Sequence, residues 1–174
     1  LTSLFLAALM LPLFACTQDG GNTVQQSGTL RINEVVSSNG ESLVDDTYGS
    51  PDWIELYNGS DRDVNLFNYI ITDDLTAMDK GKYYLLPDVT LKAGGYLVLY
   101  ANKSDAVYES GTICLNFALK KNGGEQLAIL DVHEQVVDSV TLPAMEKDIS
   151  YARIGDQFLY CSKPTPAAAN ASKD

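Results

Sequence analysis

Short segments of alternating apolar and polar residues, divided by turn-forming residues, constrain this chain more than any other feature. From residue 29 to 163 no window shows convincing helical spacing of apolar residues. Side chains on a strand point to opposite faces at successive residues, so alternation is typical of strands with one face against a core. Short strands separated by turns every ~8–12 residues predict a β-sandwich or barrel. The 174 residues are enough for one such domain and too few for two.

The segment from Pro51 to Gly59 is the centre of this pattern and contains the only Trp in the chain. Its residues alternate, and Asn58-Gly59 is a turn signal that ends the segment. We expect an interior strand whose two faces differ. One face carries Ile54 and Leu56, and the other carries Trp53, Glu55 and Tyr57.

The strand expected before it, within residues 29–36, is less regular. Leu30, Ile32 and Val36 are expected to share one face, although Glu34 interrupts the alternation. The run from Tyr96 to Tyr100 is apolar on both faces, which favours an interior strand. Further strands are expected around 64–72, 83–86, 89–91, 114–119, 126–130, 136–142, 150–154 and 158–160.

The first 28 residues predict a location outside the cytoplasm. Residues 1–15 form an uncharged apolar run that is typical of a secretory signal and too short to span a bilayer. Leu13 to Cys16 resembles a bacterial lipobox, in which the Cys thiol is acylated and becomes a stable membrane anchor. Residues 16–28 then read as anchor and flexible tether, and Thr17 in place of Asp resembles outer-membrane sorting. An ordinary secretory signal is the alternative.

The charge balance limits the partners that we expect. The chain has 12 Lys and Arg against 23 Asp and Glu, for a formal charge of -11. Nucleic-acid binding depends on Lys and Arg that neutralise phosphates, so we expect no nucleic acid. The same charge argues against electrostatic attraction to anionic lipid. Proteins, glycans and cations stay compatible with this surface.

A series of motifs resembles the lamin tail domain in its bacterial form. The motifs are 32–35, 52–58, 94–98, 123–127, 137–140, 150–153, 164–166 and 169–170, so the resemblance covers about 29 to 170. It implies an immunoglobulin-like β-sandwich and a non-catalytic interaction module, and it transfers no catalytic residues. No heptad repeat occurs, so a filament coiled coil is not implied.

The acidic loops suggest a calcium site. The candidate ligands are Asp45, Asp46, Asp52 and Glu55, which Asp73 and Asp74 could join. Ca²⁺ takes six to eight oxygen ligands, which carboxylate-rich loops supply. This would make a Ca²⁺-dependent adhesion or glycan-binding domain. The alternative is that Asp52 caps a turn while Glu34 and Glu55 accept backbone or Tyr hydrogen bonds.

A third hypothesis is an envelope hydrolase that uses Glu34 and Glu55 as general acid and base. It would need a groove, and no long aromatic-rich loop predicts one. His133, the only histidine, falls in a predicted turn, which favours a solvent-facing residue over a catalytic base.

Three further features allow more than one interpretation. Cys114 and Cys161 could form a disulfide outside the cytoplasm, or both could be buried thiols. Residues 164–174 are rich in Pro, Ala and Ser and are expected to trail along the surface or fray. The ten tyrosines suit recognition, although such rings also pack across strands.

Overall fold

The computed structural model describes residues 30–108 and 110–170. The predicted signal, the tether and Cys16 lie outside these residues, so lipidation stays a prediction. No helix in the described part of the chain is long and apolar enough to cross a membrane.

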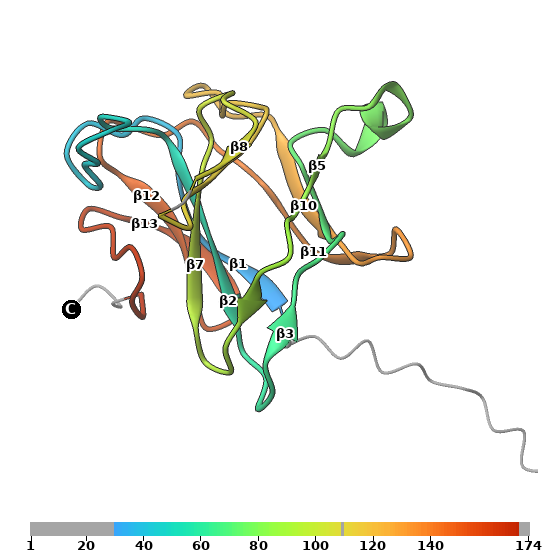
Figure 1. Ribbon diagram of the computed structural model, residues 1–174. Coiled ribbons are helices and arrows are strands. Elements are labelled where there is room, and N and C mark those ends of the chain that lie inside the picture. Colours follow the sequence, from blue (N-terminus) through green and yellow to red (C-terminus); the bar gives the residue numbers. More distant parts are fainter. Residues whose placement is uncertain (1–29, 109, 171–174) are drawn as a thin grey trace, which may run out of the picture.

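Two β-sheets pack face to face in the sandwich that the alternation predicts (Figure 1). The larger sheet has the order β13 (Gln157–Cys161), β12 (Ser150–Ile154), β1 (Leu30–Val36), β2 (Trp53–Asn58), β7 (Tyr96–Tyr100), β9 (Ile113–Cys114) and β8 (Ala106–Val107). The smaller sheet has the order β11 (Val136–Thr141), β10 (Gln126–Leu130), β4 (Ile70–Thr72) and β5 (Tyr84–Leu85). A separate pair joins β3 (Val64–Asn65) to β6 (Thr90–Leu91).

Strands β2 and β7 lie in the interior of the larger sheet, as predicted. The expected strand over 114–119 is wrong in extent, because β9 covers only two residues. A short 3₁₀ helix, η1 (Leu75–Lys80), follows β4, and its first turn is capped by the Asp74 side chain.

The main core lies between the two sheets. Ile54 and Leu56 of β2 are fully buried there, together with Leu127 and Ile129 of β10. Trp53 is fully buried in a second cluster that also contains Val36 and Tyr100. The two faces predicted for β2 are therefore confirmed.

A β-bulge in β1 changes which residues face this core. Ile32 pairs with Leu56, whereas Glu34 pairs with Glu55, so Asn33 is the extra residue. After the bulge Val35 joins the main core, and Val36 packs beside Trp53 on the opposite face. The expectation that Val36 shares a face with Leu30 and Ile32 is therefore wrong.

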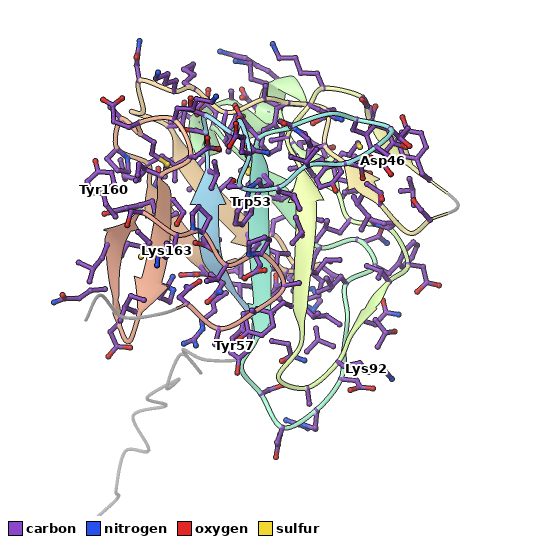
Figure 2. All side chains as sticks on the ribbon, turned by 90° about the vertical axis from the view of Figure 1, so that its left-hand side faces the viewer. Asp46, Trp53, Tyr57, Lys92, Tyr160 and Lys163 are labelled. Carbon is purple, nitrogen blue, oxygen red and sulfur yellow. The ribbon has the colours of Figure 1, made fainter. Side chains whose placement is uncertain are left out.

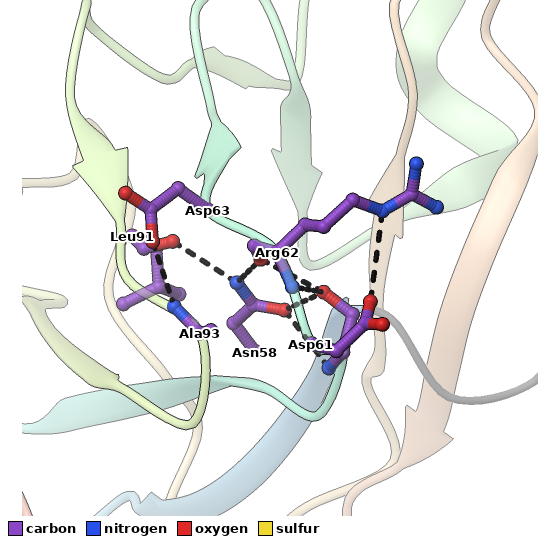
Figure 3. Close-up of polar contacts among 7 residues, drawn as sticks. Asn58, Asp61, Arg62, Asp63, Leu91 and Ala93 are labelled. Atoms are coloured by element: carbon purple, nitrogen blue, oxygen red, sulfur yellow. Dashed lines mark hydrogen bonds and ion pairs between the residues drawn. The ribbon is translucent and has the colours of Figure 1, made fainter.

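The turn after β2 is built around a buried asparagine (Figure 3). The Asn58 side chain donates to the carbonyls of Arg62 and Leu91 at 2.7 and 3.0 Å. Its Oδ1 accepts hydrogen bonds from the backbone N–H and the hydroxyl of Ser60. The side chain thus replaces strand hydrogen bonds where the chain leaves the sheet, as the turn signal predicts.

Candidate functional site

Two buried carboxylates lie side by side on the outer face of the larger sheet. Glu34 of β1 and Glu55 of β2 are direct cross-strand neighbours, and both residues are 0% exposed. Figure 2 looks onto this face, with Trp53 at the upper end of β2 and Tyr57 at its lower end. Buried charges require compensation by hydrogen bonds, so the surroundings of the pair decide what it can do.

The C-terminal strap, which we define as residues 164–170, covers this pair. The Thr165 N–H and hydroxyl donate to Glu34 Oε2 at 2.9 and 3.2 Å. The Ala167 N–H donates to Glu55 Oε2. The sequence analysis expects residues 164–174 to trail along the surface or fray. Residues 164–170 instead have a fixed position, because their main-chain N–H groups donate to both carboxylates.

The remaining carboxylate oxygens are satisfied from within the sheet. Ser150 of β12 donates its hydroxyl to Glu34 Oε1. Asn33, the bulge residue, donates its side-chain amide to Glu55 Oε1 at 2.8 Å. All four oxygens of the pair therefore accept a hydrogen bond.

Asn170 fastens the end of the strap to the sheet. Its Nδ2 donates to the carbonyls of Asn33 and Arg153 at 3.0 and 2.9 Å. Its Oδ1 accepts from the Asn33 amide at 3.3 Å and lies 3.1 Å from the Thr165 hydroxyl, whose single proton is shared between this oxygen and Glu34 Oε2. The strap, the bulge and β12 thus form one polar network.

The environment raises both pKa values. Burial raises the pKa of Glu34, against the lowering effect of its hydrogen bonds from Ser150 and Thr165. Burial raises the pKa of Glu55 to about 7, and the neighbouring Glu34 charge adds to this. A raised carboxyl pKa is typical of general acids, but a glycosidic substrate would need a groove beside the pair. Here the strap occupies that space.

Glu34 and Glu55, the pair that the hydrolase hypothesis requires, do lie side by side. Both glutamates accept backbone hydrogen bonds, as the alternative reading of the sequence expects. Their side-chain donors are Ser150, Thr165 and Asn33, and no tyrosine donates to them.

The predicted calcium ligands do not converge on one point. Asp45 accepts hydrogen bonds from the backbone of Thr47 and Tyr48 and from the Tyr100 hydroxyl, at 2.8, 3.0 and 3.1 Å. The Thr47 N–H is the main reason why the pKa of Asp45 is lowered.

The other candidate ligands are placed differently. Asp52 accepts from the Asn39 N–H at 2.9 Å, which fits the turn-capping alternative, while Asp46 is exposed and Glu55 lies under the strap. Within residues 30–108 and 110–170, no group of three or more His, Cys, Asp or Glu side chains could hold a metal ion.

Cys114 and Cys161 do not form a disulfide. Cys161 is on the edge strand β13 and Cys114 is on β9, with four strands between them. At about 4.8 Å per strand, this separation far exceeds the ~5.5 Å between the Cα atoms of a disulfide. The Cys114 sulfur accepts from the Asn102 amide at 3.3 Å. The candidate disulfide between these two residues is therefore wrong, and both residues are buried.

His133 is exposed, as predicted. It lies in the turn between β10 and β11, where its backbone N–H donates to Asp131 Oδ1 at 2.9 Å. No described carboxylate or hydroxyl forms a hydrogen bond with its ring, so the structure shows no triad here.

The sequence reasoning missed Asn33, Ser150 and Asn170 as partners of the glutamates. One signal was available: 164–166 and 169–170 are among the motifs that carry the family resemblance. Read as part of the domain and not as its tail, they would have suggested a fixed position.

Comparison with known families agrees with this architecture. The fold is an immunoglobulin-like, nearly all-β sandwich. The model of the lamin tail domain family matches residues 23–144, which is more than half of the chain. This protein belongs to the lamin tail domain family. A search of curated proteins returned no match. Strands β12 and β13 and the strap follow the matched region.

Proposed function

We propose that this protein is a non-catalytic interaction module that a lipid on Cys16 holds at the bacterial cell envelope. One observation carries the non-catalytic part: Glu34 and Glu55, the pair that the hydrolase hypothesis requires, are fully buried and all their carboxylate oxygens accept hydrogen bonds. The family match supports the same conclusion, because lamin tail domains are generally non-catalytic.

The lipid anchor rests on sequence alone. Leu13 to Cys16 has the lipobox pattern, and the following polar residues are suited to hold the domain off a membrane. Thr17 favours the outer membrane as the destination. This order of anchor, tether and domain supports an exposed module that binds by contact.

The outer sheet face beside the strap offers a surface suited to a protein or glycan. Tyr57 and Tyr96 lie with ring centroids 4.8 Å apart, and both are half-buried. The Arg31 guanidinium lies 4.8 Å from the centroid of the Tyr57 ring. Rigid aromatic rings with polar tips beside a stacked Arg are typical of recognition surfaces.

Expression in a bacterial host tests the anchor. The chain with Cys16 should appear in the membrane fraction with acyl chains detectable by mass spectrometry, and Cys16→Ser should appear in the soluble fraction. Equal membrane association of both forms, without acylation, would refute the anchor.

A substrate panel tests the non-catalytic part separately. The purified chain should turn over no glycoside or ester substrate. Turnover that both Glu34→Gln and Glu55→Gln abolish, while the variants stay folded, would show that the glutamates are catalytic.

A further inference from the structure

The larger sheet ends in an edge strand that lacks the usual protection. Strand β13 pairs with β12 on one side, and no described strand lies on its other side. Exposed sheet edges invite pairing with another chain, and proteins blunt them with a charge, a proline, a bulge or a short length. The sequence of β13, QFLYC, has no charge and no proline, and its register with β12 is regular over all five residues. This border of the sheet, near Tyr160 in Figure 2, is therefore open to a further strand.

The other edges of the two sheets are protected. Strands β8 and β5 are only two residues long. Strand β11 carries a bulge, because its register with β10 shifts between Ile129 and Leu130. Asp138 of β11 also turns toward the opposite sheet, where its carboxylate forms an ion pair with Arg153 of β12 at 2.6 Å. Among the edges in the described residues, β13 alone is both long and regular.

The register of the β12–β13 hairpin determines which backbone groups of β13 are free. Ile154 and Gln157 flank the two-residue turn Gly155-Asp156, so they form the first hydrogen-bonded pair of the ladder. Hydrogen-bonded and non-hydrogen-bonded pairs alternate along antiparallel strands. The N–H and C=O groups of Phe158 and Tyr160 therefore point away from β12, toward the open edge.

These free groups make β13 complementary to itself. Phe158 and Tyr160 lie symmetrically about Leu159. In an antiparallel pair of two β13 strands centred on Leu159, Phe158 of one copy lies opposite Tyr160 of the other. Each such pair exchanges two hydrogen bonds, so the two pairs use every free N–H and C=O of both strands. A shift of the register by two residues would leave half of these groups unpaired.

The side chains of β13 fit the same arrangement. Leu159 is 47% exposed on the outer face, so two copies of it would meet across the symmetry axis. On the inner face, the Tyr151 ring lies 5.2 Å from that of Phe158 and 5.4 Å from that of Tyr160. These contacts fix both rings before a partner arrives, and aromatic pairs across strands stabilise a sheet.

The charges around β13 also favour a second copy. The formal charge of -11 opposes self-association in general. The strand itself has no charge, and the exposed residues Asp156 and Lys163 flank it at opposite ends. In the register centred on Leu159, Asp156 of one copy lies beside Lys163 of the other at each end. Opposite charges therefore meet at the border of the contact.

We propose that two copies of this chain associate through β13, so that their larger sheets join into one continuous sheet. The free backbone groups, the exposed side chains and the flanking charges are each symmetric about Leu159, which favours a second copy over an unrelated extended peptide. The strap leaves the edge clear, because it crosses the outer face toward Glu34 and Glu55. The contact uses neither the glutamate pair nor the proposed anchor.

Sedimentation of the purified full chain tests the proposal. The wild type should form dimers at concentrations between about 1 µM and 1 mM. Leu159→Lys and Leu159→Glu each bring like charges together at the axis, so each should weaken self-association at least about tenfold. An equal mixture of the two variants should form a mixed dimer, because opposite charges then meet. A wild type that stays monomeric, or a mixture that stays monomeric, overturns the proposal.

Matched controls separate this contact from a general effect of charge. Val107 is 53% exposed on β8, at the opposite edge of the same sheet. Val107→Lys and Val107→Glu should leave the dimer unchanged, and a loss equal to that of the Leu159 variants overturns the proposal. Leu159 is half-exposed, so its variants should fold, which unchanged unfolding midpoints of the monomers would confirm.

Amide hydrogen exchange gives a second measurement at the backbone. At a concentration where the wild type is dimeric, the N–H groups of Phe158 and Tyr160 should exchange at least about tenfold more slowly than in Leu159→Lys, because only the dimer pairs them. Equal exchange of both groups in the two proteins overturns the proposed register.

Discussion

The two faces of β2 are both buried, but they are buried in different ways. The inner face, with Ile54 and Leu56, packs against apolar residues of the opposite sheet. The outer face, with Glu55 below Trp53, is covered by the strap and by residues such as Leu43 and Tyr48 from the loop before β2. The inner face is thus stabilised by apolar area, and the outer face depends on directional hydrogen bonds from segments distant in the sequence.

Substitutions on the inner face of β2 should cause the largest loss of stability. Ile54→Ala should lower the free energy of unfolding by about 3–5 kcal/mol, because Ile54 is fully buried and the sheets cannot close around the cavity. Val98→Ala, on the half-buried outer side of β7, should cost about 1 kcal/mol. Urea unfolding measures both. Similar losses would show that the two faces do not differ.

The pH dependence of stability should come from the outer face. The pKa of Glu55 is raised to about 7, so between its ordinary value of 4.5 and about 7 the native state binds more protons than the unfolded state. Stability from this group is therefore fully present below about 4.5 and is lost as the pH rises through 7, by at most about 3 kcal/mol.

Unfolding of the wild type and of Glu55→Gln should be compared between pH 5 and 8. The wild type should lose stability relative to the variant as the pH rises. If the stabilities of the wild type and of Glu55→Gln changed equally with pH, the raised pKa of Glu55 would be contradicted.

Removal of the strap should have an intermediate effect. A chain that ends at Lys163 loses the Thr165 and Ala167 donors to both carboxylates, and water can replace them only in part. We expect a loss of about 2 kcal/mol in the free energy of unfolding. A chain that ends at Asn170 keeps all the strap hydrogen bonds and is the control. Unchanged stability of the shorter chain would show that the strap is not required.

The strap backbone offers a smaller test. Ala167 has φ of 61°, in the left-handed region. Ala167→Gly should relieve a cost of about 1 kcal/mol, partly offset by the greater freedom of Gly in the unfolded chain. A net gain below about 1 kcal/mol is expected in thermal unfolding. Ala169→Gly, outside the left-handed region, should give no gain. If Ala167→Gly and Ala169→Gly changed the unfolding temperature equally, the left-handed backbone of Ala167 would not be a source of strain.

Calcium should have the smallest effect. Asp45, Asp46, Asp52 and Glu55 do not converge, so millimolar Ca²⁺ or EDTA should leave the Tm unchanged. If Ca²⁺ raised the Tm of the wild type but not that of Asp45→Asn, the acidic loops would bind calcium after all.

The same comparison explains what the sequence could predict. The period of two in residues 53–57 separates the faces of β2, because the apolar core requires it. The position of Val36 could not be predicted in this way, because the bulge at Asn33 inserts one residue and reverses the faces beyond it.

Long-range order was beyond the reach of local patterns. The four strands between Cys114 and Cys161 follow from topology, which spacing does not encode. The strap has no periodicity, and its docking depends on individual N–H groups such as that of Ala167.

The position of the strap also orders events during synthesis. Thr165 follows its partner Glu34 by 131 residues, and Ala167 follows Glu55 by 112. A nascent chain must therefore expose residues 34–167 outside the ribosome before these two buried glutamates find their strap donors. Contacts between such distant residues form slowly, so the outer face stays incomplete until residues 165–167 have been synthesised.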